Sequence, residues 1–523
     1  MTNKSRRKQV LMGTLLLTVS SFIAKLLSAV YRIPFQNMVG NIGFYVYQQV
    51  YPIYGIGMTF ALTGLPVFIS KLVVDTKNPS DQVAVVYRIQ TILILISAII
   101  FGVLQFGASF IAFQMADPRL APVIKSVSWM FLWVPFLATW RGYFQGQMNM
   151  RPTAYSQVVE QVVRVSFILL VAGWSVKSVV DPYRMGRLAM FSAPIAGLCA
   201  LLVVLWHVKQ VGLPHSSHRK VYRHLLIETL TVGGTLCLVS AVMLLLQLVD
   251  SFSIVSGLRE YGYQLVAAQN IKGIYDRSQT LVQLGMVIGT ASVTAVLPGL
   301  SVAYAHRQAL TFEHIAKTNV RTNLALSLAM SIGLFTLMPE INRVLFATAQ
   351  LNGTIGVYCL SIIFATVLLT NSTILQSRNQ YLPTMIAIIC GFVTKIGINK
   401  FLVIIFGIIG ASIATMISLI VMIIVIRLLS HHQLAKMISL KQIIKLAGVL
   451  SVMAVIVRSI AILLQSFQLI KSDRIESLIV LVVCIPVGII IFLGGCRLLQ
   501  VFSLREWLAI PMVSKFMKFK GMK

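Results

Sequence analysis

Long apolar runs separated by short polar connections recur along the whole chain. A membrane-spanning helix needs about 20 apolar residues, and roughly fourteen segments of that kind fit the chain. The first lobe of expected spans comprises 10–36, 44–72, 83–114, 120–146, 153–176 and 186–211. The second comprises 225–251, 268–300, 311–338, 355–377, 381–402 and 405–429, followed by 446–467 and 477–500. The pattern therefore predicts an all-α integral membrane protein.

Two polar, basic connections divide this series of spans. The first runs from His207 to His224, and the second from His431 to Lys445. They predict three parts, namely an N-lobe at 1–211, a C-lobe at 212–430, and two helices with a basic tail at 431–523. A faint internal repeat supports the two lobes, because residues 47–70 can be aligned with residues 275–298. A tyrosine, a glycine and a methionine are identical at aligned positions. Lobes that start on the same side predict a substrate site between them.

The net charge of the chain indicates its topology and argues against one class of partner. The chain is 57% hydrophobic and only 11% charged, yet its formal net charge is +30, from 44 Lys+Arg against 14 Asp+Glu. The basic residues flank the apolar runs instead of gathering on one soluble domain, so no nucleic-acid partner is expected. Loops rich in Lys and Arg stay in the cytoplasm. An even number of spans then places both termini there.

Chemical motifs are sparse. The six cysteines lie within apolar runs without a C-x-x-C pair, so we interpret them as small buried side chains and expect no disulfide or metal site. No G-x-x-x-x-G-K-[ST] loop or zinc-protease motif is present, which predicts a non-enzymatic protein that does not hydrolyse nucleotides. A membrane glycosyltransferase or polymerase is the competing class, and it would need catalytic carboxylates and a sizeable external loop.

Charged residues inside the expected spans are the main candidates for function, because a charge at bilayer depth costs about 2.5–3.5 kcal/mol or more. Lys25 and Arg32 lie seven residues apart in the first span, which would put both on one helix face. We interpret them as lining a wet, cationic cavity. Snorkelling of Lys25 toward the headgroups is the alternative.

A second group of polar residues recurs at helical spacing in the fifth and eighth spans. Gln157, Glu160 and Arg164 form one stripe, and the i,i+4 spacing predicts that Glu160 pairs with Arg164. This pair either lines the cavity or locks helices together. Lys272 and Asp276 form the other stripe, with Arg277 beside them.

Asp250 ends the seventh expected span and is the acidic candidate for ion coupling or for pairing with Arg277. The alternative is a position at the membrane interface. Aromatic residues such as Tyr51 and Tyr54 could contact a sugar, but most of them are expected to be interfacial anchors.

Three motifs resemble one known family. They are 21–73 (SFIAKLLSAVYRIPFQN…), Trp140–Val165 (WRGYFQGQMNMRPTAYSQVVEQVVRV) and Ile271–Gly285 (IKGIYDRSQTLVQLG). They resemble Gram-positive members of the polysaccharide-transporter/MurJ-SpoVB family, within the multidrug/oligosaccharidyl-lipid/polysaccharide (MOP) exporter superfamily. The resemblance implies two six-helix lobes in a V, with two C-terminal helices that shape a groove for a polyprenyl tail. It also implies a cationic cavity formed by Lys25, Arg32 and Arg277, with Lys71 as a further member.

The resemblance implies a flippase in the bacterial cytoplasmic membrane that moves an undecaprenyl-pyrophosphate-linked peptidoglycan precursor, lipid II, to the outer leaflet. The expected partners are this lipid-linked oligosaccharide, membrane lipids and, as candidates, cell-wall synthesis proteins. No cofactor is expected, and H⁺, Na⁺ or the membrane potential would drive transport. Alternatives within the fold are a flippase for another lipid-linked sugar (capsule, exopolysaccharide or spore cortex) and a cation-coupled drug exporter.

Overall fold

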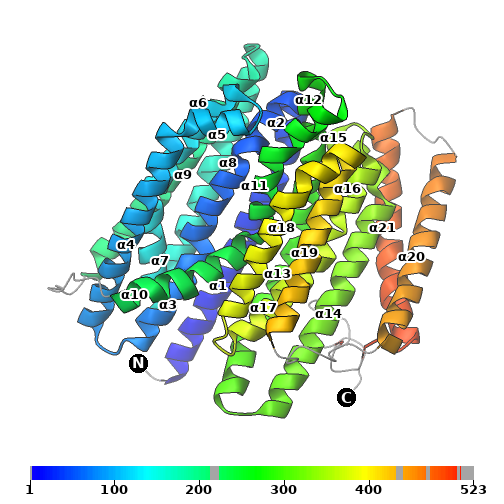
Figure 1. Cartoon of the computed structure of the whole chain (residues 1–523). Helices are drawn as coiled ribbons and strands as arrows, with labels where there is room; N and C mark the ends of the chain where they lie inside the picture. The colour runs from blue at the N-terminus through cyan, green and yellow to red at the C-terminus, as the bar shows by residue number, and fades with distance from the viewer. Residues whose placement is uncertain (1–2, 213–222, 431–439, 467–471, 503–506, 508–523) are drawn as a thin grey trace. The chain divides into compact units, whose positions relative to one another are not determined.

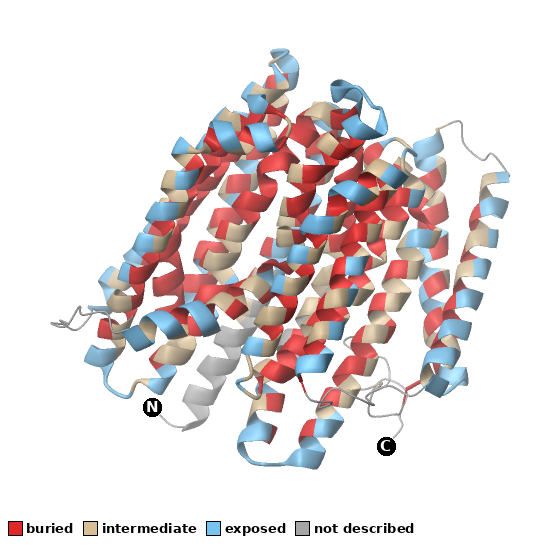
Figure 2. Cartoon of the chain, in the orientation of Figure 1, coloured by how far each residue is buried: buried red, intermediate tan, exposed pale blue. Residues whose placement is uncertain are grey.

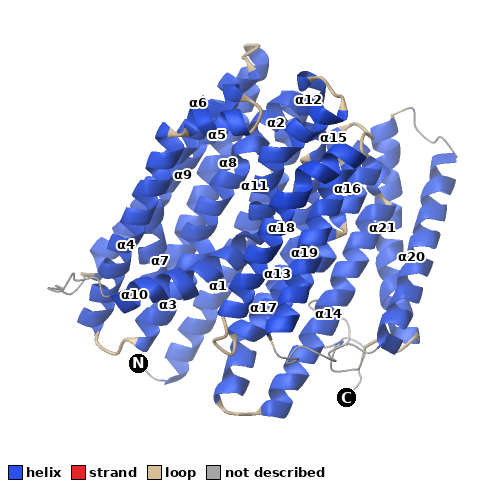
Figure 3. Cartoon of the chain, viewed as in Figure 1, coloured by secondary structure: helices blue, strands red, loops and turns tan. Residues whose placement is uncertain are grey.

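A computed structural model describes residues 3–212, 223–430, 440–466, 472–502 and 507, and these residues form helices joined by short turns (Figure 1, Figure 3). The basic connections predicted at 207–224 and 431–445 fall partly outside the described residues. No strand occurs in the part of the chain that the structure describes. The all-α prediction is confirmed.

The chain divides into two compact units, which are described separately. Unit 1 is Met1–Asp276 with Asn399–Gly407, and unit 2 is Arg277–Ile398 with Ile408–Lys523. Unit 1 contains α1 (Asn3–Val30), α2 (Arg32–Thr59), η1 (Phe60–Gly64), α3 (Leu65–Asp75), α4 (Pro79–Phe106), α5 (Ala108–Gln114), η2 (Pro118–Leu120), α6 (Ala121–Ser128), η3 (Trp129–Leu132), α7 (Val134–Gly146), α8 (Arg151–Lys177), α9 (Pro182–Val211), α10 (Arg223–Glu228), η4 (Thr229–Gly233), α11 (Gly234–Tyr261) and α12 (Leu265–Tyr275). The three-part division at 211 and 430 stays a prediction.

Unit 2 contains most of the C-terminal half of the chain. Its helices are α13 (Arg277–Ala305), α14 (Ala309–Thr336), α15 (Met338–Phe346), α16 (Asn352–Cys359), α17 (Ser361–Gln376), α18 (Leu382–Phe406, the end of which belongs to unit 1), α19 (Ile409–Leu429), α20 (Leu440–Ser466) and α21 (Asp473–Leu498). A small apolar cluster formed by Leu300, Phe312 and Ile374 packs α13, α14 and α17 together.

Among the described residues, eleven helical stretches are long and apolar enough to cross a membrane, or twelve if the bent pair α14 and α15 is one span. One stretch, Val19–Asp75, contains two predicted spans, because Gly40 breaks α2 with φ 69° and ψ −175°. Glycine adopts this positive φ without the steric cost that a side chain brings. The span predicted at 268–300 lies on α12 and α13.

Several boundaries differ from the prediction. The helix predicted to end at 251 continues to Tyr261, because the apolar run extends past Asp250 before Gly262 ends α11 at φ 121°. The span predicted at 268–300 is interrupted at Asp276, which separates α12 from α13. Asp250 is therefore interior to a helix and fully buried, and the prediction that it lies at a span end is wrong.

The distribution of side chains fits a lipid environment. Large apolar side chains on the outward faces of α4 and α21 are exposed, for example Leu95 and Ile99 on α4 and Ile490 on α21 (Figure 2). Arg32, Arg141, Arg164 and Arg277 are instead among the largest fully buried side chains. In a soluble protein, apolar side chains are mostly buried and charged ones exposed, and here the arrangement is reversed. Charge is therefore concentrated inside each unit, where it needs polar partners.

Candidate functional site

The tyrosine–arginine cluster of unit 1 comprises Tyr31, Arg32, Tyr47, Tyr51, Tyr54 and Arg164. Arg32 begins α2, and its guanidinium carbon lies 4.0 Å from the centre of the Tyr51 ring. The side chain is completely buried. None of its three guanidinium nitrogens has a hydrogen-bond partner among the described residues. Arg32 is thus held by an aromatic face, and its N–H donors are unused.

Arg164 enters the same cluster from α8. Its guanidinium carbon lies 4.4 Å from the Tyr54 ring centre and 5.1 Å from that of Tyr31. Nη2 donates to Ser28 Oγ at 3.2 Å and to Gln161 Oε1 at 3.3 Å. Nε and Nη1 have no hydrogen-bond partner among the described residues. Arg164 also keeps spare donors in a dry environment.

One face of α2 builds the aromatic wall of this cluster. Tyr47, Tyr51 and Tyr54 are spaced by four and three residues, so they share a helix face. Their rings contact in sequence, with centroids 6.2 Å apart for Tyr47 and Tyr51 and 5.5 Å for Tyr51 and Tyr54. The Tyr31 and Tyr47 hydroxyls are 2.8 Å apart. Tyr51 and Tyr54 are buried, so the prediction that they are interfacial anchors is wrong.

Glu160 has a different partner from the predicted one. Its Oε2 accepts from Arg141 Nη2 of α7 at 2.8 Å, with both side chains buried. Arg141 Nε also donates to Ser156 Oγ at 3.0 Å. Within the described residues, no ion pair joins Glu160 to Arg164, so the predicted i,i+4 pair is wrong. Arg141 had been missed, although it is an arginine within the span predicted at 120–146.

The other candidates of α1, α3 and α8 lie around this region with varied burial. Gln157 Oε1 accepts from Ser21 Oγ of α1 at 3.0 Å. Lys25 lies on α1, and Arg32 is fully buried at the start of α2. The backbone at Tyr31 between them is helical, with φ −58° and ψ −24°, and the shared cavity face of the two residues stays a prediction. Lys71 is half-buried on α3.

The acidic candidates of unit 1 form buried polar contacts. Lys272 and Asp276 make an ion pair across one turn at the end of α12, and both side chains are buried. Asp276 Oδ2 has no hydrogen-bond partner among the described residues. Asp250 Oδ1 accepts from Asn399 Nδ2 at 3.0 Å. Asn399 was absent from the predicted set.

Arg277 is the corresponding basic residue of unit 2. Its Nη1 donates to Asn342 Oδ1 at 3.1 Å and to Thr348 Oγ1 at 2.5 Å. Its guanidinium carbon lies 5.0 Å from the Phe346 ring centre. Asn342 is fixed in turn, because its Nδ2 donates to Gln350 O at 2.8 Å and to Asn352 Oδ1 at 2.9 Å. Neutral groups therefore orient Arg277.

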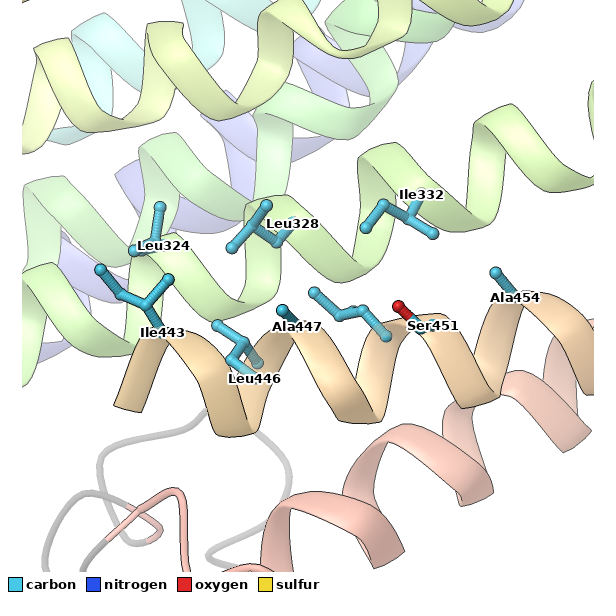
Figure 4. Close-up of a pocket in the computed structure, with 9 residues that line it drawn as sticks. Leu324, Leu328, Ile332, Ile443, Leu446, Ala447, Ser451 and Ala454 are labelled. Atoms are coloured by element: carbon cyan, nitrogen blue, oxygen red, sulfur yellow. The ribbon is translucent and has the colours of Figure 1, made fainter. Parts of the chain in front are cut away.

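An apolar groove lies in unit 2 between α14 and α20, with a volume of about 310 Å³ (Figure 4). Leu324, Leu328 and Ile332 of α14 face Ile443, Leu446, Ala447 and Ala454 of α20, and Ser451 is its one polar lining residue. A groove with this lining suits a hydrocarbon chain.

The chemistry available in the tyrosine–arginine cluster is anion binding. Guanidinium groups bind phosphate through paired N–H donors, and such contacts strengthen away from water. Within the described residues, no group of three or more His, Cys, Asp or Glu side chains could hold a metal ion.

Comparison with solved structures shows the fold. The chain superposes on a structure titled "Lipid II flippase MurJ, inward closed conformation" with a TM-score of 0.68, covering 92% of this chain and 98% of that one at 14% identity. It also matches an inward-facing multidrug resistance MATE family transporter of the MOP superfamily, with a TM-score of 0.61, 81% and 99% coverage, and 14% identity. The predicted MOP-type fold is confirmed.

Comparison of sequences defines the family. The family described as "Polysaccharide biosynthesis protein" matches residues 10–304. A Bacillus subtilis (strain 168) protein named "Uncharacterized membrane protein YabM" is 34% identical over 417 residues, which is 78% of each chain. "Lipid II flippase MurJ" of the same organism is 23% identical over 516 residues, covering 93% of this chain and 94% of that one. The chain belongs to the polysaccharide biosynthesis protein family, as the three motifs predicted.

Proposed function

We propose that this protein is a flippase that carries lipid II from the inner to the outer leaflet of the bacterial cytoplasmic membrane by alternating access. The observation that carries the proposal is the tyrosine–arginine cluster, in which Arg32 and Arg164 are buried with spare N–H donors. Neither guanidinium forms an ion pair with a carboxylate among the described residues, and a buried cation costs free energy that an anionic partner can offset. The pyrophosphate of an undecaprenyl-linked precursor would bring negative charge to these donors.

Arg277 and the apolar groove serve the same substrate in this proposal. Asn342 and Thr348 orient Arg277, so its guanidinium would present its positive charge to a phosphate or a sugar oxygen in a defined direction. The groove between α14 and α20 would receive part of the polyprenyl tail. Lys25 and Lys71 would attract the anionic headgroup as the substrate enters the protein. Each lysine would act as a point charge, because it lacks the bidentate geometry of arginine.

The proposed topology has both termini in the cytoplasm, as the basic loops predict. The proposed driving force is a cation gradient or the membrane potential, with Asp250 and Asp276 as the carboxylates for ion coupling. Both are buried within unit 1, and each has hydrogen-bonding or ion-pair contacts with neighbouring side chains.

A second candidate is a flippase for another lipid-linked oligosaccharide. The favouring observation is that identity to YabM, at 34%, exceeds the 23% identity to the lipid II flippase of the same organism. Both functions need an anion site and a tail groove, so those features do not separate them.

The experiment that separates them is depletion of the host's lipid II flippase while this chain is expressed. If the proposal holds, growth continues and lipid II stays accessible to an impermeant reagent outside the cell. Arg32→Ala should abolish both effects. A matched control is Arg187→Ala, because Arg187 is an exposed arginine of α9 in the same unit. If the wild-type chain is present at normal level and lipid II remains inaccessible, the lipid II assignment is wrong.

A further inference from the structure

Asp117 is the centre of a hydrogen-bond network that joins four elements of unit 1. It lies between α5 and η2 and is only 2% exposed. Its Oδ2 accepts from Tyr45 Oη of α2 at 3.1 Å, from Tyr183 Oη of α9 at 2.7 Å and from Gln269 Nε2 of α12 at 3.0 Å. One carboxylate oxygen thus holds three helices that lie far apart in the sequence.

The contact between α12 and α2 is unusually close at this network. A Cβ on Gly273 would lie 2.2 Å from the backbone oxygen of Asn41, so only glycine fits there. Gln269 lies one turn before Gly273 on α12, and Tyr45 lies one turn after Asn41 on α2. The Asp117 network therefore reinforces a backbone-to-backbone approach of α12 on α2.

Neighbouring contacts extend this attachment. Gln49, one turn beyond Tyr45, donates to Tyr45 Oη at 3.4 Å and to the Ser251 backbone oxygen of α11 at 3.1 Å. Both α11 and α12, which precede Arg277 in the chain, are thereby bound to α2. The Asp117 carboxylate is the charged member of this set of contacts.

The charged and titratable groups around Asp117 are few. On η2, Arg119 donates its backbone N–H to Asp117 Oδ1 at 3.2 Å, while its guanidinium pairs with Asp181 at 2.8 Å and covers the Tyr183 ring. From α2 and α9 come Tyr45 and Tyr183, and from α12 the neutral Gln269. Lys272, one turn further along α12, is paired with Asp276.

We propose that Asp117 is a proton-binding latch, which holds α12 against α2 when ionised and releases it when protonated. A carboxylate accepts from several donors at one oxygen, whereas a carboxyl group has a proton of its own on one oxygen. Protonation removes the negative charge that the three donors share, and a proton on Oδ2 itself would also meet those donors. Loss of one hydrogen bond to a charged group shifts the closed-to-open ratio by about tenfold or more.

The direction of the pH effect follows from the site. Burial raises the pKa of the Asp117 carboxyl above its ordinary value, and the hydrogen bonds from Tyr183 and Tyr45 offset part of that rise. The ionised, closed latch is therefore present above this raised pKa and is lost as pH falls through it. On the proposed topology the latch faces the cell exterior, where the medium sets the pH.

The test measures the opening of α12 directly. Ala268, adjacent to Gln269, is fully buried, and an Ala268→Cys reporter should react with a membrane-impermeant maleimide only when α12 separates from α2. Labelling in intact cells is compared with the parent chain, which has its six native cysteines. Val179→Cys, in an exposed turn of unit 1, corrects for the effect of pH on the reagent.

The latch predicts low labelling of the reporter at neutral pH and several-fold higher labelling at acidic pH, because protonation of the carboxylate opens the latch. Asp117→Asn should give high labelling at both pH values, because the neutral amide oxygen forms weaker hydrogen bonds than a carboxylate and the amide cannot titrate. Asp181→Asn, which changes an exposed neighbouring acid, should keep the pH response of the parent. Tyr183→Phe removes one donor and leaves the carboxylate, so it should raise labelling at neutral pH without abolishing the pH response.

Equal labelling of the parent and Asp117→Asn chains at both pH values would overturn the latch. So would a reporter that is already fully labelled at neutral pH in the parent chain. If Asp117→Asn does not reach the membrane, Tyr183→Phe decides, and neutral-pH labelling equal to that of the parent chain counts against the latch. The assay needs no lipid substrate, so its failure would leave the proposed flippase function standing.

Discussion

Two buried arginines on neighbouring helices of unit 1 have opposite surroundings. Arg141 meets the Glu160 carboxylate at 2.8 Å, and its charge is balanced. Arg164, one turn beyond Glu160 on α8, meets tyrosine rings and neutral oxygens instead. Both side chains are buried, so the two arginines differ in the groups that face the guanidinium. In the proposed function, the Arg141–Glu160 pair is structural, whereas Arg164 is kept for the anionic substrate.

The largest expected effect is on stability, from Arg141→Ala. This change leaves Glu160 buried without its partner, and removing one member of a buried pair costs about 3–5 kcal/mol. We expect much less folded protein in the membrane and a lower midpoint of thermal unfolding in detergent. The control is the double variant Arg141→Met with Glu160→Met, which removes both charges and should recover most of the stability. A double variant as unstable as the single one would show that the ion pair is not the cause.

Arg164→Met should differ from Arg141→Ala in its effects. The stability of the protein should be normal, and its transport activity should be lost. Replacing an uncompensated buried charge by an apolar side chain of similar length relieves its desolvation, so we expect no loss of stability. Transport should fall about tenfold or more, because a charge-assisted hydrogen bond contributes about 1.5–3 kcal/mol. External accessibility of lipid II per folded molecule measures the transport, and thermal unfolding measures the stability. If Arg164→Met destabilises the protein as strongly as Arg141→Ala and transports normally, the distinction between the two arginines fails.

The contrast also shows which features of the chain can be predicted from sequence. Spans follow from apolar length, and a charged residue inside a span, such as Arg32 or Arg277, can be recognised from the sequence. The Lys272–Asp276 pair forms as its spacing allows. Spacing alone was misleading for Glu160 and Arg164, because the stronger partner, Arg141, comes from another helix. Which side chains pair between two helices depends on how the helices pack, and a single sequence does not show this packing.

The tyrosines give a second example of the same limit. Enrichment of tyrosine at membrane interfaces is an average over many spans, and it predicted the wrong environment for Tyr51 and Tyr54. Their spacing with Tyr47 on one face of α2, close to the buried Arg32, was the available signal. For Asp117 and Asn399 no such spacing signal was available, because their partners come from helices distant in the sequence.

The smallest expected effect tests how the uncompensated arginines are held. Tyr51 presents its ring to Arg32 at 4.0 Å, an attraction of about 0.5–2 kcal/mol that depends on the ring and not on the hydroxyl. Tyr51→Phe should therefore keep most of the transport, while Tyr51→Leu should lower it several-fold by letting the guanidinium of Arg32 shift. Trp140→Leu is a matched control, because Trp140 is a buried aromatic residue of α7 that packs on Tyr87 and Tyr143. Equal transport by the Phe and Leu variants of Tyr51 would mean that the ring does not position Arg32, and that the cluster holds its arginines through the packing of α2 alone.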